Sequence, residues 1–127
     1  MPNNNTAQLY APKNYWTLSP EDHAMICNGC GAANAKFDFV PDTIYGLGVN
    51  PACNIHDYMY LMGETIDDKK EADRVFLNNL LRLIDHKGGW RRFLRRRRAL
   101  KYYNAVVELG GPAFWDGKNA PGTFKRQ

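Results

Sequence analysis

Long apolar stretches are missing from this chain of 127 residues. No run approaches the roughly 18 apolar residues that mark a membrane-spanning helix. The opening residues, MPNNNTAQLYAPKNYW, contain neither the basic segment nor the apolar segment of a secretory signal peptide. We therefore expect a chain that is made in the cytoplasm without a membrane anchor. If it acts elsewhere, a lysis, injection or virion-type route that needs no signal peptide would deliver it.

Cysteine is scarce, with only Cys27, Cys30 and Cys53. An odd number leaves at least one thiol unpaired if disulfides form, and a reducing compartment would keep all three reduced, so the redox state stays open. Repeats, low-complexity tracts and interdomain linkers are also missing. A chain of this length buries a single core. We predict an N-terminal arm over residues 1–14 and one domain over residues 15–127.

Acidic residues are missing from one segment. Between Trp90 and Lys101 the sequence WRRFLRRRRALK holds seven basic residues in twelve and no acid, although the net charge of the whole chain is only +4. One end of the molecule should therefore be strongly cationic. Such a run could bind nucleic acid without sequence choice, bind an anionic membrane, or form a solvated helix face.

The residues that we select for membrane or anion contact are Arg91, Arg92, Arg95 and Arg96. Together with Arg98, they cannot all lie on one narrow face of a helix. We therefore expect some of them to pair instead with the acids between Glu64 and Glu71.

Helix signals dominate the rest of the chain. Ser19 suits an N-cap and Pro20 a first helical position, which predicts a short helix ending near Cys27. Longer helices are expected from about Pro51 to Gly63, Asp67 to Asp85 and Trp90 to Leu109. The long irregular connection before Pro51 is typical of a functional loop, in which Phe37, Phe39 and Val40 could serve as anchors or form a short strand.

The helix expected from Pro51 carries two neighbouring stripes. One is an ordinary core stripe of Ala52, Ile55, Met59 and Met62. The other has the same helical spacing but consists of Cys53, His56, Asp57 and Tyr60. Because MGETI is a short connection, the next helix should pack antiparallel to this one, which can bring Asp73 opposite His56 and Tyr60.

A histidine and a carboxylate in this arrangement can activate water. The histidine accepts the proton on one ring nitrogen, while the carboxylate holds the other nitrogen and stabilises the imidazolium. His56 with Asp73 could supply both groups. Asp57 points about 100° round the helix, toward the side where the irregular loop could lie. There its carboxylate could join loop carbonyls in the oxygen-rich site that calcium prefers.

These motifs resemble the calcium-dependent phospholipase A2 superfamily, whose signature is His-Asp on a helix, a Tyr four positions after the His, and an Asp on a facing helix. The resemblance is closest to the short bacterial and fungal branch and covers roughly Met25 to Leu80. It rests on NGC at 28–30 and YGLGVNPACNIHDYMY at 45–60, and ALKYYNAVVELGG is similar to that branch's last helix. The implied fold is mainly α, with a central antiparallel helix hairpin and an irregular calcium-binding loop.

The resemblance also implies an activity and a role for each matching residue. The activity is calcium-dependent hydrolysis of the sn-2 acyl ester of glycerophospholipids at a membrane surface. His56 would be the general base, Asp73 would orient it, and Tyr60 would bond to Asp73. Asp57, Asn28 and the carbonyl of Gly29 would bind Ca²⁺, which would bind the substrate phosphate and stabilise the oxyanion. Cys30 and Cys53 would form a disulfide, whereas Cys27 has no counterpart.

One departure concerns the metal. Relatives offer a carboxylate where this chain has Asn28, so calcium should bind more weakly here or recruit another ligand such as Asp42.

Two alternatives use the same residues. Cys27, Cys30, Cys53 and His56 have the spacing of a Cys3His zinc site, in which His56 could not act as a base. The chain would then be a zinc-stabilised basic helical module that binds nucleic acid or anionic membranes. A phospholipase-like domain that has lost catalysis would be a second alternative. The sequence predicts neither head-group preference nor oligomeric state.

Overall fold

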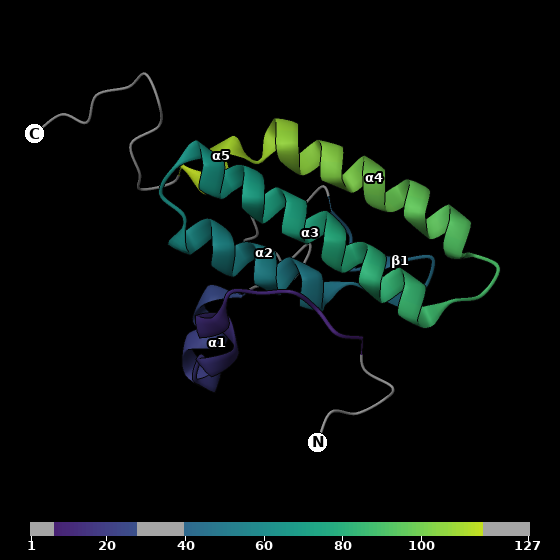
Figure 1. Cartoon of the computed structure of the whole chain (residues 1–127), viewed down its shortest axis with the longest axis horizontal. Helices are drawn as coiled ribbons and strands as arrows, with labels where there is room; N and C mark the ends of the chain where they lie inside the picture. The colour runs from purple at the N-terminus through teal and green to yellow at the C-terminus, as the bar shows by residue number, and fades with distance from the viewer. Residues whose placement is uncertain (1–6, 28–39, 116–127) are drawn as a thin grey trace, which may run out of the picture.

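The computed structural model describes residues 7–27 and 40–115, and this part is mainly helical (Figure 1). Its elements are the 3-10 helix η1 (Lys13–Thr17), α1 (Pro20–Ile26), β1 (Thr43–Ile44), β2 (Leu47–Gly48), α2 (Asn50–Met62), α3 (Ile66–Lys87), α4 (Arg92–Leu109) and α5 (Gly111–Phe114). Of the helices in these residues, none is long and apolar enough to cross a membrane. The four helices predicted from the sequence are all present, with ends shifted by one or two residues.

Local capping explains where these helices begin. The Ser19 side chain accepts a hydrogen bond from the Asp22 amide at 3.1 Å, and Pro20 occupies the first turn of α1. At the start of α3, Thr65 and Asp68 form a capping box, because each side chain accepts a hydrogen bond from the other residue's backbone amide. The short connection between α2 and α3 is therefore a fixed turn.

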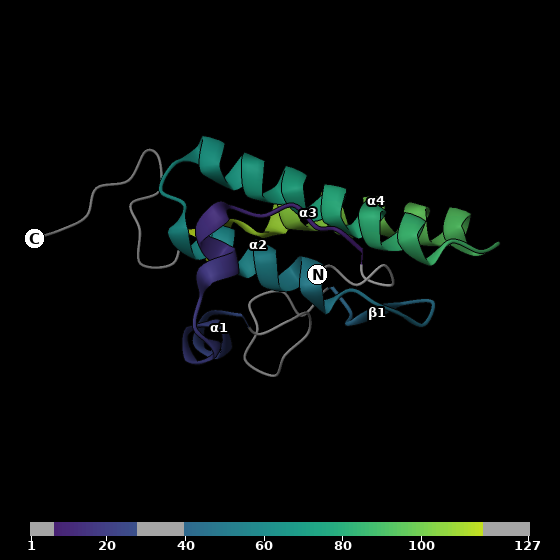
Figure 2. The ribbon, with the colours of Figure 1, turned by 60° about the horizontal axis from the view of Figure 1, so that its bottom comes forward.

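The three long helices form the body of the molecule. Helix α3 packs against both α2 and α4 (Figures 1 and 2). Helices α2 and α3 are antiparallel, as the short connection predicts. This arrangement places the middle of α2 against the first half of α3, where the two helices contribute the candidate site.

Strands β1 and β2 form a small antiparallel hairpin that pairs Thr43 with Gly48 and Ile44 with Leu47. Its turn uses Tyr45 at φ 47° and Gly46 at φ 81°, two successive positive φ angles that match the twist of a tight hairpin. The strand expected near Val40 is therefore further along the chain. Val40 is buried without joining a strand, whereas Phe37 and Phe39 lie outside the described residues.

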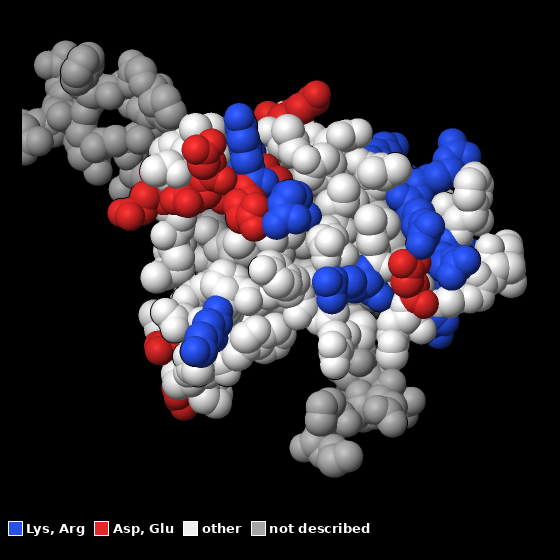
Figure 3. Space-filling model, in the orientation of Figure 1, with Lys and Arg blue, Asp and Glu red and all other residues white. Residues whose placement is uncertain are grey.

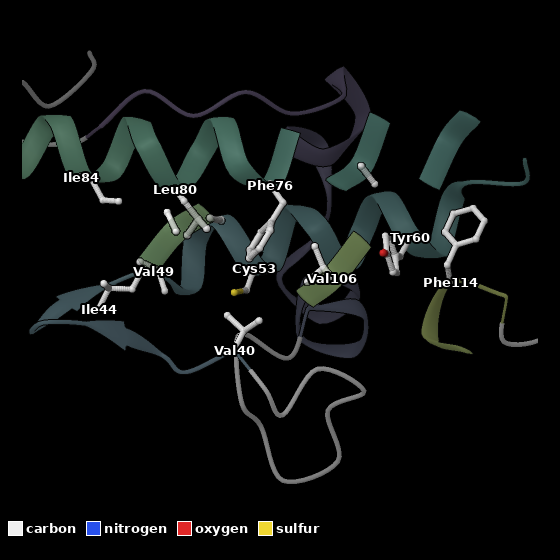
Figure 4. Packing of buried hydrophobic residues seen from close by; sticks show 13 residues of the cluster. Val40, Ile44, Val49, Cys53, Tyr60, Phe76, Leu80, Ile84, Val106 and Phe114 are labelled. Carbon is white, nitrogen blue, oxygen red and sulfur yellow. The ribbon is translucent and has the colours of Figure 1, made fainter. Parts of the chain in front are cut away.

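The main core lies between α2, α3 and α4 and extends to the hairpin and α5 (Figure 4). A second cluster joins Tyr15, Ile55, Tyr58 and Val75, so α2 and α3 are apolar on two sides. Ala52 and Ile55 are buried as predicted and Met59 is partly buried. The prediction for Met62 was wrong, because its side chain is exposed, whereas Tyr60 in the same turn of α2 is buried.

The described part of the N-terminal arm lies on the domain. The backbone amide and carbonyl of Tyr10 pair with the side-chain amide of Asn79 on α3, at 2.7 and 2.8 Å. Asn79 is fully buried, so this pairing satisfies a polar group that would otherwise be costly to bury. Residues 7–12 are thus fixed to α3.

Candidate functional site

The middle of α2 and the first half of α3 bring together the predicted His56, Tyr60 and Asp73. Nε2 of His56 lies 2.8 Å from Oδ1 of Asp73, and the Tyr60 hydroxyl donates to the same oxygen at 2.6 Å. His56 is only 2% exposed and Asp73 only 1%. The sequence prediction that Asp73 faces both residues of α2 is confirmed by these contacts.

Aromatic rings hold the imidazole on two sides. The ring of Tyr60, one turn further along α2, lies 4.1 Å from that of His56 between centroids, and the ring of Phe76 on α3 lies 4.7 Å away. Phe114 of α5 packs edge-on against Tyr60 at 5.1 Å. The orientation of His56 is thus fixed by packing as well as by its hydrogen bond.

Lys69 completes the network, and the sequence reasoning missed it. Its Nζ donates to Oδ2 of Asp73 at 2.8 Å and to the carbonyls of Val106 and Val107, each at 3.2 Å. The three protons of the ammonium thus match three acceptors. Because Val106 and Val107 belong to the last turn of α4, Lys69 also places a positive charge at the negative end of that helix. One available signal was its i, i+4 spacing from Asp73.

Burial and hydrogen bonding determine the charges in the network. Burial raises the pKa of the Asp73 carboxyl, but hydrogen bonds from His56, Lys69 and Tyr60 more than offset this, so the pKa falls below its usual value. Burial lowers the pKa of His56, although its bond to Asp73 opposes the effect. Burial and the bond to Asp73 both raise the pKa of Tyr60. Near neutral pH these groups are a carboxylate, a neutral imidazole and a neutral phenol.

These protonation states assign the tautomer of His56. An ionised carboxylate only accepts hydrogen bonds, so the proton between His56 and Asp73 must be on Nε2. In a neutral imidazole, Nδ1 then carries the lone pair. A buried imidazole with a basic Nδ1 and an Nε2–H group held by a carboxylate can accept a proton and remain oriented while charged.

Asp57 is half-buried and belongs to the part of α2 that faces the end of α1. Burial raises the pKa of both Tyr15 and Cys27, and the nearby charge of Asp57 raises both further. Cys27 immediately precedes Asn28 and Gly29, the other predicted calcium ligands, which lie outside the described residues. A single carboxylate at this position fits the oxygen chemistry of a calcium site. Over residues 7–27 and 40–115, no three His, Cys, Asp or Glu side chains gather as a metal site, and Asp42 is exposed.

The cysteines differ in their chemistry. Cys53 is disulfide-bonded, and its predicted partner Cys30 lies outside the described residues. Cys27 is a free thiol whose Sγ donates to the carbonyl of Asn54 at 3.4 Å. Because a disulfide sulfur cannot act as a thiolate ligand, this state of Cys53 argues against the Cys3His zinc alternative. The contact of His56 with Asp73 argues in the same direction.

The four arginines predicted for membrane or anion contact have different environments. Arg91 and Arg92 are exposed. Arg95 is a correction: it is 5% exposed and donates to the carbonyls of Ile44 and Tyr45 at 3.0 and 2.6 Å, so it anchors the hairpin. Arg96 is exposed and pairs with Asp85 at 2.6 Å, not with the acids between Glu64 and Glu71. Their spacing round α4 explains the split, because Arg95 alone of the four faces the hairpin.

Comparison of the chain with protein-family models, with curated proteins and with solved structures found no significant match.

Proposed function

We propose that this protein is a calcium-dependent phospholipase A2-type hydrolase that cleaves the sn-2 acyl ester of glycerophospholipids. The observation that carries the proposal is the buried network of His56, Asp73 and Tyr60, in which both residues of α2 share one oxygen of Asp73. A mainly helical fold with an antiparallel α2–α3 hairpin supports the same proposal. The calcium-binding loop would begin directly after Cys27, which lies near the charge of Asp57.

In the proposed reaction, His56 first accepts a proton from water and later donates the same proton to the leaving group. Nδ1 takes a proton from water as the water oxygen attacks the sn-2 carbonyl carbon. The imidazolium then returns this proton to the leaving oxygen of the glycerol backbone as the acyl bond breaks. The products are a fatty acid and a lysophospholipid. Asp73 stays ionised throughout and stabilises the imidazolium through Nε2–H.

Asp57, with Asn28 and Gly29, would hold the metal. When bound, Ca²⁺ supplies positive charge to the substrate phosphate and to the developing oxyanion. Lys69 and Tyr60 have a different task, because they bond to Asp73 and fix the carboxylate that orients His56. In this proposal His56 would transfer the proton, and Asp57, about 100° further round α2, would help to hold the metal beside the same carbonyl.

Fatty acid release from mixed phosphatidylcholine and phosphatidylserine vesicles, with calcium or with EGTA, tests this proposal. We expect release only with calcium. His56→Ala should reduce release by about 10²- to 10⁴-fold, because the general base is lost. His56→Gln should reduce release as much as His56→Ala, although the glutamine amide can still donate to Asp73. Asp57→Asn should abolish calcium-dependent release.

Matched controls separate chemistry from folding. His86→Ala and Asp67→Asn change exposed residues of the same types on α3, so they should keep wild-type release. Far-ultraviolet circular dichroism should show helical spectra for all variants. Wild-type release by both His56 variants would show that His56 is not the base, and release that persists in EGTA would exclude the calcium mechanism.

A further inference from the structure

The end of the molecule at the α3–α4 connection combines exposed aromatic rings with exposed cations. Trp90 is 78% exposed and Phe93 is 65% exposed, which is unusual for such large apolar side chains. Arg91 stacks on the Trp90 ring at 5.0 Å and Arg97 on the Phe93 ring at 5.8 Å. We call this surface the basic–aromatic end and define it by Trp90, Phe93, Arg91, Arg97, Arg98 and Lys101.

Within the described residues, the cations of this surface form no ion pairs with acids. Across residues 7–27 and 40–115, the ion pairs use other cations, and on α4 only Arg96 takes part, with Asp85. Figure 3 shows basic side chains gathered at the α3–α4 end and acidic side chains gathered at the opposite end, where α2 meets α3. On this face of the described residues the charge is thus polarised along α3, and the basic–aromatic end carries the positive charge.

A hollow of about 350 Å³ lies within this surface, between the β1–β2 turn and α4. Tyr45, Leu94, Arg97, Arg98 and Lys101 line it, so three of its five side chains are cationic. The Arg98 guanidinium lies 5.8 Å from the centre of the Tyr45 ring, and Arg95 fixes the Tyr45 backbone beneath it. Guanidinium and ammonium groups that converge on one hollow suit a phosphate, which arginine can bind with two parallel hydrogen bonds.

We propose that the basic–aromatic end docks on anionic phospholipid bilayers, with a headgroup phosphate in the hollow and with Trp90 and Phe93 in the interfacial layer. Aromatic rings beside basic side chains are typical of residues that anchor proteins at the membrane–water interface. Nucleic acid suits the surface less well, because Arg91 and Arg97 each cover a ring face that a base would need for stacking.

This inference rests on the proposed function in one respect: docking would bring the proposed hydrolase to its phospholipid substrate. The helix rise puts Gly88 about 22 Å from Asp73 along α3, so the docking surface and the catalytic network are separate. Binding can therefore be measured without turnover. Sedimentation with sucrose-loaded vesicles in EGTA serves this purpose, with phosphatidylcholine alone or mixed with phosphatidylserine.

We expect the wild type to sediment with the mixed vesicles, to bind phosphatidylcholine weakly, and to dissociate as salt rises. Arg97→Gln with Arg98→Gln should weaken partitioning about 30-fold. Lys13→Gln with Lys70→Gln removes the same charge from exposed residues elsewhere and should change partitioning less than about threefold, because the field of distant charges is screened.

The aromatic contribution has its own pair of variants. Trp90→Ala with Phe93→Ala should weaken partitioning about tenfold while the salt dependence remains, because apolar contact is lost and charge is kept. Trp16→Ala changes an aromatic residue of η1 that is also exposed and should have no effect.

Three outcomes would overturn the inference. The first is equal loss of binding in the Arg97/Arg98 and Lys13/Lys70 variants, which would mean that only net charge matters. The second is binding of a short DNA duplex without binding of mixed vesicles. The third is binding of inorganic phosphate alone, which would identify an anion pocket without a docking role. If vesicles bind in EGTA but no fatty acid is released with calcium, docking stands and the proposed hydrolysis fails.

Discussion

Nζ of Lys69 lies 2.8 Å from Oδ2 of Asp73, one turn away on α3, and both side chains are buried. The other oxygen of Asp73 binds His56 and Tyr60, so Lys69 and His56 bind different oxygens of one carboxylate. Lys69 also holds the last turn of α4 through Val106 and Val107. The middle of α2, the first half of α3 and the last turn of α4 are therefore joined through Lys69 and Asp73.

Replacing Lys69 should destabilise the protein strongly. Lys69→Met leaves a carboxylate buried without its cation, which costs about 3–5 kcal/mol in the free energy of unfolding. The double variant Lys69→Met with Asp73→Asn should be less destabilised than the sum of the single variants, because the unpaired charge is gone. Urea unfolding followed by circular dichroism measures all three.

Lys70→Met is the matched control, because Lys70 is exposed beside Lys69. It should change the free energy of unfolding by less than about 0.5 kcal/mol. Strict additivity in the double variant would contradict the coupling, and equal effects of Lys69→Met and Lys70→Met would show that burial of the ammonium has no energetic role.

Replacing Arg95 tests whether this residue of the arginine run stabilises the β1–β2 hairpin. Arg95→Ala leaves the carbonyls of Ile44 and Tyr45 without their charged donor, so we expect a loss of about 3 kcal/mol in the free energy of unfolding. Arg92→Ala, on an exposed position of the same helix, should cost less than about 0.5 kcal/mol. Thermal and urea unfolding measure both variants. Similar stability of the two would mean that the hairpin does not depend on Arg95.

The sequence predicted the helical framework because its signals are local. Ser19 before Pro20, and Gly63 and Gly110 after apolar runs, mark helix ends through caps that depend on only a few neighbours. The facing of His56 and Asp73 also followed from local rules, since a short connection forces two helices to be antiparallel.

The roles of Lys69 and Arg95 could not be read from the sequence in this way. Both belong to charged segments that look like solvated helix faces, and their burial depends on contacts far along the chain. Lys69 bonds to carbonyls at 106 and 107, and Arg95 to those at 44 and 45. Such pairings depend on tertiary packing, which brings an unsatisfied carbonyl next to a long cationic side chain, so local sequence rules do not predict them.

The lowered pKa of Asp73 predicts how its contribution to stability depends on pH. Burial alone would raise this pKa, but hydrogen bonds from His56, Lys69 and Tyr60 lower it below the unfolded value. Its stabilisation is therefore fully present above the unfolded pKa of about 3.9 and is lost as pH falls through the folded pKa. The difference in unfolding free energy between wild type and Asp73→Asn should be constant from pH 7 to about pH 5 and shrink below about pH 4.

Urea unfolding over this pH range tests the prediction, with Asp67→Asn as the control. Asp67 is exposed in the first turn of α3, so its variant should differ little from wild type at every pH. A difference for Asp73→Asn that grows on acidification would reverse the sign and refute the pairing of this carboxylate in the folded state.

Cys27 should react slowly with alkylating reagents, because burial and the charge of Asp57 raise the pKa of its thiol to about 11. Only the thiolate is nucleophilic, so at pH 8 about one thiol in a thousand is reactive. The rate of iodoacetamide labelling should rise about tenfold per pH unit until the pH of the solution approaches 11.

Asp57→Asn removes one cause of the raised pKa of Cys27 and should speed its labelling at pH 8. Mass spectrometry of the non-reduced protein should show a single label, because Cys53 is in a disulfide. Three labels without reductant would mean that the disulfide is missing, and fast labelling at pH 8 would mean that the thiol is neither buried nor near the carboxylate.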